Sequence, residues 1–146
     1  MKQVTLRLEG PMQAWGVNGA AQIRRTHPQP QKRTVLGLIR AAKGLARDQT
    51  WDELERLEFS CQTIKSGIRM WDFASMSRII SADGSKFHPR GIQEKEYLAN
   101  AAFTVMLSGD DSLIDEVIAA LENPVFLLGL GRRDCMPSSP ILMNFE

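Results

Sequence analysis

The side chains with the clearest chemistry in this chain are cationic, and they gather at its start. Residues 1–47 hold nine lysines and arginines and one acid, whereas the remaining residues hold nine bases and sixteen acids. Because guanidinium and ammonium groups bind phosphate through charge-assisted hydrogen bonds, this segregation favours a polyanionic partner such as nucleic acid. The alternative is that the later acids fold over the bases as surface ion pairs, which would add little stability.

The candidate phosphate ligands of this segment surround a predicted helix. Two prolines one residue apart predict a loop over residues 26–32, and apolar residues at helical spacing predict a helix over about residues 33–46. Basic residues line the side of this helix opposite its apolar stripe, with Gly37 and Gly44 beside them. Small residues there would let a sugar–phosphate backbone approach; the alternative is a solvated face whose glycines serve helix packing. The candidates are Arg24, Arg25, His27, Lys32, Arg33, Arg40 and Lys43.

A second candidate is the segment Leu128-Gly129-Leu130-Gly131-Arg132-Arg133. It lacks the third glycine of a dinucleotide fingerprint and the Lys-Ser/Thr of a phosphate loop. Glycines nevertheless bring main-chain N–H groups close to an anion, and adjacent arginines suit bidentate phosphate contacts. We therefore expect Gly129, Gly131, Arg132 and Arg133 to bind phosphate; the alternative is a tight turn with solvated arginines.

Aromatic residues could add base stacking. Alternation of apolar and polar residues predicts a strand over residues 4–9, which Gly10-Pro11 should end. Trp15 follows in a loop bounded by glycines, where it either contributes to a binding edge or folds back as a lid on the core.

Catalytic and metal chemistry are poorly supported. The candidates for metal-free RNA cleavage are His27, His88, Lys32 and Tyr97. The two cysteines form no C-x-x-C pair, so we expect a reduced, cytoplasmic protein. No apolar run approaches the length of a membrane span, and no metal site or cofactor is expected.

The remaining pattern predicts one α+β domain over residues 1–146. A short helix should start at Thr50 and end near residue 57, and strands should cover residues 59–68, 73–80, 99–107 and 125–130. A second long helix should run from Asp110 or Asp111 to Leu121. This order is the split βαβ pattern of a ferredoxin-like (RRM-like) domain. The turn signal Asp83-Gly84 predicts an irregular protruding hairpin, an arm or thumb, over about residues 72–96; it carries Arg78, Lys86, Phe87, His88 and Arg90.

Several of these segments together resemble one family. The opening from Leu6 to Gly16 resembles that of the CasD ("Cas five") family, a subunit of the type I-E CRISPR Cascade complex. The resemblance continues in residues 25–28 and 33–39, in residues 97–105, and in the glycine-arginine ending over residues 130–137, which is shared more loosely across the larger repeat-associated RNA-binding superfamily. Familiar members are longer and carry an additional C-terminal segment.

The resemblance implies a modified ferredoxin-like domain whose thumb contacts neighbouring subunits. It implies a non-catalytic subunit that binds the 5′ handle of the CRISPR RNA, contacts the Cascade backbone subunits and the large subunit, and meets target DNA indirectly. The system would serve antiviral defence or RNA-guided DNA targeting. In a neighbouring subtype a relative cuts RNA, so a metal-independent endoribonuclease that processes repeat RNA is the alternative.

Overall fold

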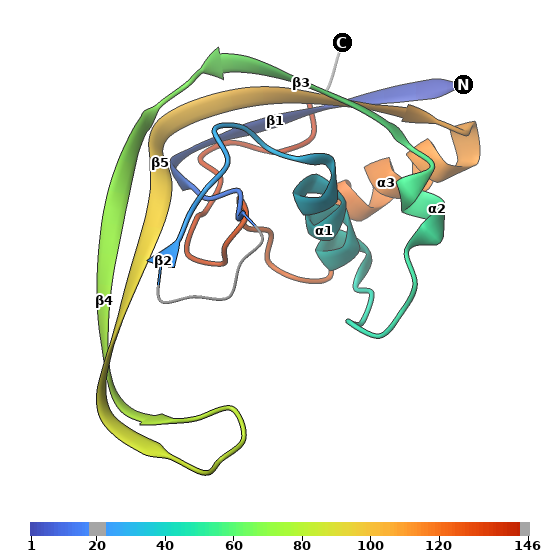
Figure 1. The fold of residues 1–146 in the computed structure, drawn as a ribbon. Coiled ribbons are helices and arrows are strands. Elements are labelled where there is room, and N and C mark those ends of the chain that lie inside the picture. Colours follow the sequence, from blue (N-terminus) through green and yellow to red (C-terminus); the bar gives the residue numbers. More distant parts are fainter. Residues whose placement is uncertain (18–22, 144–146) are drawn as a thin grey trace.

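The computed structural model describes residues 1–17 and 23–143, which form a compact body and a long curved arm (Figure 1). Within these residues, five strands make one sheet and three helices accompany it. The elements are β1 (Lys2–Gln13), β2 (Ile23–Arg24), α1 (Lys32–Lys43), α2 (Asp52–Glu55), β3 (Glu58–Lys65), β4 (Ile68–Ile80), β5 (Phe87–Gly109) and α3 (Asp111–Glu122). The chain is therefore a mixed α+β protein, as the sequence predicts at this level.

The 23-residue strand β5 organises both parts of the molecule. Its C-terminal half pairs antiparallel with β1 on one edge and with β3 on the other, and its N-terminal half pairs antiparallel with β4. The change from body to arm falls near Asn100 (φ 56°) and Gly67 (φ 71°), which both have left-handed backbone conformations. The short strand β2 pairs parallel with β5 at the root of the arm, where Ile23 is opposite Glu94.

The core lies between one face of the sheet and the two long helices (Figure 1). In β1, Val4, Leu6 and Leu8 are buried, while Arg7 on the other face is exposed. The predicted inner face of α3 is confirmed, since Leu113, Ile114, Val117 and Leu121 are all buried. Helix α1 buries Val35, Leu36, Leu38, Ile39 and Ala42, and it ends at Gly44 (φ 73°) instead of continuing to residue 46. A left-handed glycine at this place is a common helix terminator.

The predicted final strand over residues 125–130 is wrong. This segment is irregular, and Val125, Phe126 and Leu127 are exposed. The amide of Val125 donates to the carbonyl of Ala42 (2.9 Å), so the segment packs on the end of α1. The outer edge of β1 is instead lined by residues 138–143: Arg7 N donates to Ile141 O (2.7 Å) and Met143 N to Thr5 O (3.1 Å).

Three local predictions also need correction. Strand β1 passes through Gly10-Pro11 to Gln13, because Met12 and Gln13 still pair with β5 and proline is tolerated on an edge strand. Helix α2 has Trp51, not Thr50, as its N-cap. The return strand of the arm pairs with β4 from Phe87 onward, and Gly91 takes part in the pairing; the ladder skips only Pro89, opposite Arg78 (φ 57°).

The predicted hairpin at the tip of the arm is confirmed, but its loop is longer than the two residues Asp83-Gly84. Strand β4 ends at Ile80 and β5 begins at Phe87, Ser81 N donates to Lys86 O (2.9 Å), and Gly84 has φ 74°. No helix of the described residues is long and apolar enough to cross a membrane.

Candidate nucleic-acid interface

The two predicted phosphate-binding segments line one groove, which we call the α1 groove. It is a cavity of about 390 Å³ between α1 and the loop of residues 129–133; its lining comprises Thr34, Gly37, Leu38, Ala41, Phe126, Leu127, Gly129, Gly131, Arg132 and Arg133. A second recess of about 380 Å³ shares four of these residues and adds Arg40, Leu45, Ala46 and Arg47. The fold therefore brings together residues that are almost 100 positions apart in the chain.

Glycines keep this groove open and hold its walls together. A Cβ atom on Gly37 would meet nothing within 4 Å, so this position faces open space. Gly131 has φ 91° and packs against the carbonyl oxygen of Ala14 so closely that a Cβ there would overlap it. The amide of Ala14 donates to Leu130 O (3.1 Å), which joins the loop before Trp15 to the glycine-arginine loop.

Five predicted phosphate ligands have partners within the protein: Arg25 and Arg132 contact Glu96, as described below, and Lys32, Arg40 and Lys43 have other partners. Lys43 Nζ forms an ion pair with Glu116 Oε2 (2.8 Å), and Lys32 Nζ donates to Glu55 O (2.7 Å). Arg40 lies over the Trp51 ring, 4.8 Å from its centroid, and donates to Ala46 O. The surface-pairing alternative therefore holds for Lys43, and the side chains of Lys32 and Arg40 are tied to the body.

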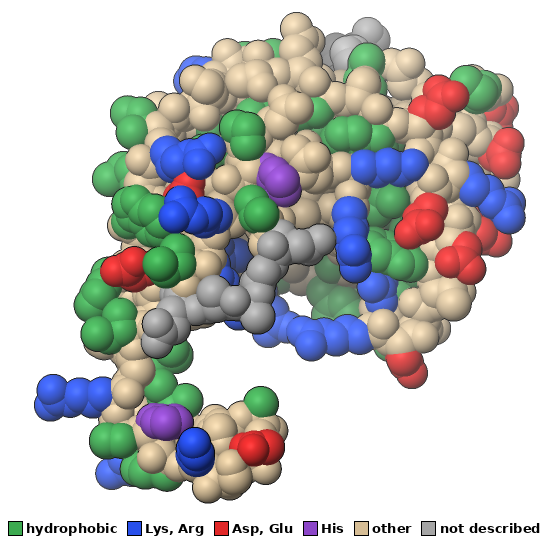
Figure 2. Space-filling view, viewed as in Figure 1, with side chains coloured by type: hydrophobic (Ala, Val, Ile, Leu, Met, Phe, Trp, Pro, Cys, Tyr) green, Lys and Arg blue, Asp and Glu red, His purple; other side chains and the backbone are tan. Residues whose placement is uncertain are grey.

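Other predicted ligands are directed to solvent. Arg24, Arg33 and Arg133 are exposed, as is Arg47 at the second recess. None of these four forms an ion pair with the described residues of the chain. Figure 2 shows Lys and Arg side chains around the hollow between the body and the arm, whereas Asp and Glu gather on the side that carries α2 and α3.

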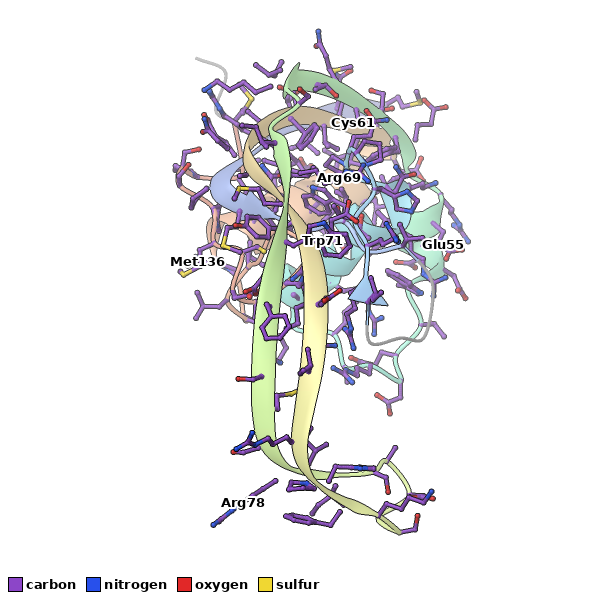
Figure 3. All side chains as sticks on the ribbon, turned by 60° about the vertical axis from the view of Figure 1, so that its left-hand side comes forward. Glu55, Cys61, Arg69, Trp71, Arg78 and Met136 are labelled. Atoms are coloured by element: carbon purple, nitrogen blue, oxygen red, sulfur yellow. The ribbon has the colours of Figure 1, made fainter. Side chains whose placement is uncertain are left out.

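A second cluster, the arm-root cluster, joins the arm to the body and consists of Arg25, Arg69, Trp71, Glu96 and Arg132. Glu96 is completely buried; Arg69 Nη1 lies 2.7 Å from its Oε1, and Arg25 Nη1 lies 3.9 Å from its Oε2. Arg132 donates to the main-chain carbonyl of Glu96. The Arg25 guanidinium lies over the Trp71 ring, 5.6 Å from the centroid. In Figure 3, Arg69 and Trp71 lie where the arm meets the body.

Sequence reasoning missed Arg69 and Glu96 and did not single out Trp71 among the aromatic residues. Trp71 is 51% exposed and lies opposite Glu96 in the strand register. The spacing of Arg69 and Trp71 on one face of a strand is a signal that could have been used. Nothing in the sequence around Glu96 indicates a buried carboxylate.

Trp15 lies in the core with no exposed surface. Its indole Nε1 donates to Gln13 Oε1 (3.1 Å), and its amide donates to Thr26 Oγ1 (2.7 Å). Gln13 is itself buried and donates to the carbonyls of Leu8 (3.0 Å) and Ala101 (2.8 Å). The indole therefore has no face open to a base, which agrees with the core alternative; a role of its loop in shaping a pocket wall stays a prediction.

The candidates for acid–base chemistry are not assembled. His27 lies in the loop beside Trp15, while His88 pairs with Ile79 near the end of the arm. Tyr97 Oη contacts Met70 Sδ (3.8 Å) on the arm. Burial raises the pKa of the Cys135 thiol to about 11, and burial also raises the pKa of Cys61. Among the described residues, no group of three or more His, Cys, Asp or Glu side chains could hold a metal ion.

The predicted thumb residues all lie in the distal half of the arm. Arg78 has a left-handed backbone conformation (φ 57°) in β4 and points away from the ribbon (Figure 3). Phe87 and Ile80 form the last pair before the turn, and both are exposed. The remaining thumb residues Lys86, His88 and Arg90 are also exposed.

Comparison with known proteins shows that this chain is a CRISPR-associated protein. The chain is a member of the family described as "CRISPR-associated protein (Cas_Cas5)", whose profile matches residues 4–145. It is 30% identical to the CRISPR system Cascade subunit CasD of Escherichia coli (strain K12), over 95% of this chain and 69% of that protein. The resemblance seen in the sequence is thereby confirmed.

Solved structures agree with this assignment. The chain matches a chain of a "CRISPR RNA-guided surveillance complex" with a TM-score of 0.89 and 30% identity, covering 97% of this chain and 62% of that one. A chain described as "Crystal structure of Cas protein" matches with a TM-score of 0.77, 29% identity and coverage of 97% and 63%. The chain thus spans a little under two thirds of the length of these solved relatives.

Proposed function

We propose that this protein is a non-catalytic RNA-binding subunit of a CRISPR Cascade-type ribonucleoprotein, in which it binds and caps the 5′ handle of the CRISPR RNA. The observation that carries the proposal is the α1 groove, where Gly37 leaves open space across from the closely packed loop that holds Gly129, Gly131, Arg132 and Arg133. The family membership and the naming of relatives as a Cascade subunit and a surveillance-complex chain support it.

The exposed bases carry the phosphates in this proposal, in contacts that depend on salt because counterions are released. We assign this role to the exposed Arg24, Arg25, Arg33 and Arg133, and add Arg47. Lys32, Arg40, Lys43 and Arg132 are retained as weaker candidates, since each is partly buried and has an intramolecular partner that would have to be replaced. His27 and the loop of Trp15 form the neighbouring wall.

The body is proposed to be a modified split βαβ, ferredoxin-like domain. Its element order β1, α1, β3, β5, α3 fits that plan, with residues 138–143 beside β1 in the position of a final strand. The single domain comprises residues 1–146, with the arm as its thumb.

The arm is proposed to contact neighbouring Cascade subunits, both the backbone subunits and the large subunit. Its support is an unusual number of exposed apolar side chains for a monomer surface, among them Phe73, Ile80 and Phe87, with Arg78, Lys86, His88 and Arg90 around them. Target DNA would be met indirectly, in a cytoplasmic complex that serves antiviral defence or RNA-guided DNA targeting.

Incubation of the protein with repeat-derived RNA in EDTA tests this function against its rival. We expect a retarded protein–RNA complex and intact RNA. Site-specific cleavage that disappears in His27→Ala would contradict the proposal and support the metal-independent endoribonuclease.

A further inference from the structure

We propose that the arm-root cluster is a nucleotide subsite: the Trp71 indole stacks on one unpaired RNA base, while Arg25 and Arg69 hold the adjacent phosphate. Glu96 acts as a positioning residue beneath them. This inference rests on the proposed function and names a place for one nucleotide of the bound strand. Arg25 and Arg132 were already candidates from the sequence, whereas Arg69, Trp71 and Glu96 come from the structure alone.

Charge is the first argument. One buried carboxylate, Glu96, lies beneath three guanidinium groups, so the cluster carries an excess of positive charge. The side chains of Arg25 and Arg69 remain 61% and 49% exposed, and an outside anion can therefore reach them. Burial of the Glu96 carboxylate costs free energy, and among the described residues only the guanidinium groups of Arg25 and Arg69 compensate its charge. The same ion pairs hold Arg25 and Arg69 in place at the surface.

The aromatic surface is the second argument. Half of Trp71 is exposed although the residue lies at the root of the arm, and Arg25 lies over its ring. An indole next to a guanidinium offers π surface and positive charge at one point, which is the combination that binds single-stranded nucleic acid without base pairing. A polar peptide or a free anion would not require the aromatic surface.

Continuity with the α1 groove is the third argument. Arg132 lines that groove and also donates to Glu96 O in the arm-root cluster. The two regions therefore meet at a single side chain. An RNA strand that leaves the α1 groove past Arg132 would therefore pass next to Trp71, which lies opposite Glu96.

Tryptophan fluorescence tests the inference on the full-length protein. The chain has three tryptophans; Trp15 is buried, Trp51 is partly buried beneath Arg40, and Trp71 is exposed. Titration with single-stranded repeat-derived RNA should quench the emission. Trp71→Phe should remove most of that quenching while it retains affinity within about threefold, and Trp71→Ala should lower affinity about tenfold.

Ile64→Ala is the control, because Ile64 is an exposed apolar residue on β3, outside both the cluster and the arm. It should leave affinity and quenching unchanged. In Glu96→Gln, loss of the carboxylate should reduce the quenching at saturating RNA, because Arg25 and the indole are no longer held together. This spectroscopic change would not follow from a role in folding alone.

An RNA with an abasic nucleotide identifies the stacked base. The affinity penalty of Trp71→Ala should disappear for an RNA that carries the abasic position at this subsite. If Trp71→Ala binds every RNA as tightly as the wild type, or if Trp71→Phe keeps the full quenching, the subsite is wrong while the proposed function stands. If the wild type binds no RNA, both are wrong.

Discussion

Gly131 and Ala14 pack backbone against backbone, and this contact joins the loop before Trp15 to the glycine-arginine loop that lines the α1 groove. Gly131 adopts φ 91°, and a Cβ on it would overlap the carbonyl oxygen of Ala14. The hydrogen bond from Ala14 N to Leu130 O (3.1 Å) fixes the same junction. The groove therefore depends on a glycine at this position for steric reasons.

Gly131→Ala should lower the free energy of unfolding by about 2 kcal/mol or more, because it combines a strained φ with backbone overlap. Gly16→Ala is the control: Gly16 is exposed, a Cβ on it would meet nothing within 4 Å, and the change should stay within about 0.5 kcal/mol. Urea denaturation measures both. Equal stability of the two variants would show that the junction is not tightly packed.

Gly37 allows stability and RNA binding to be separated. Gly37→Ala should stabilise α1 by up to about 1 kcal/mol, since glycine is a poor helix former and the added methyl group meets no neighbour. Gly37→Glu should instead weaken RNA binding, because a carboxylate would enter the groove beside Arg133. Ser112→Glu in the first turn of α3 makes a change of the same type away from the groove and should leave affinity unchanged. Similar losses in both glutamate variants would exclude a specific effect at Gly37.

The two cysteines should differ in reactivity. Burial raises the pKa of Cys135 to about 11, so this thiol is protonated at pH 8 and has no exposed surface. Cys61 is only partly buried. With a thiol-specific reagent at pH 8, we expect Cys61 to react first and Cys135 to react only on unfolding; simultaneous modification of both in the folded protein would contradict the burial of Cys135.

The tip of the arm should respond to acid. Asp83 Oδ1 accepts hydrogen bonds from Ser81 Oγ (2.6 Å), Ser85 N (3.0 Å) and Ser85 Oγ (2.7 Å), which lower its pKa to about 2. Because the folded pKa is depressed, the turn is stabilised above about pH 4, and this contribution is lost as pH falls toward 2. Exchange of the Ser85 amide should accelerate over that range relative to Asp83→Asn, which lacks the titrating group. An identical pH profile in the two proteins would contradict this assignment.

The parts of the fold that depend on local pattern were predictable. Helices α1 and α3 follow from apolar spacing, and the hairpin tip follows from Asp83-Gly84. The final strand was not, since the run from Val125 to Leu130 is apolar enough for a strand yet packs irregularly on the end of α1. The outer edge of β1, where a final strand was expected, is occupied by residues 138–143, and no local pattern of the sequence distinguishes these residues from a loop.

The candidate site was likewise predictable only in part. The charge of residues 1–47 indicates a basic surface, but only tertiary structure reveals that Lys43 meets Glu116 on α3 and that Arg40 lies over Trp51. The arm-root cluster combines residues from β4, β5 and two loops, and its centre is a buried glutamate. Long-range pairing of this kind leaves no periodic signal in the chain.

The salt dependence of RNA binding tests the central claim most directly. The affinity of the full chain for single-stranded 5′-handle RNA should be measured by fluorescence anisotropy over a range of salt concentrations for the wild type, Arg133→Ala and Arg40→Ala. If Arg133 contacts one phosphate, Arg133→Ala should flatten the log–log slope by about 0.7, while Arg40→Ala, whose guanidinium is held by Trp51 and Ala46, should change it less. A wild type that does not bind the RNA, or an Arg133→Ala slope equal to that of the wild type, would contradict the assignment of the α1 groove as the RNA-binding surface.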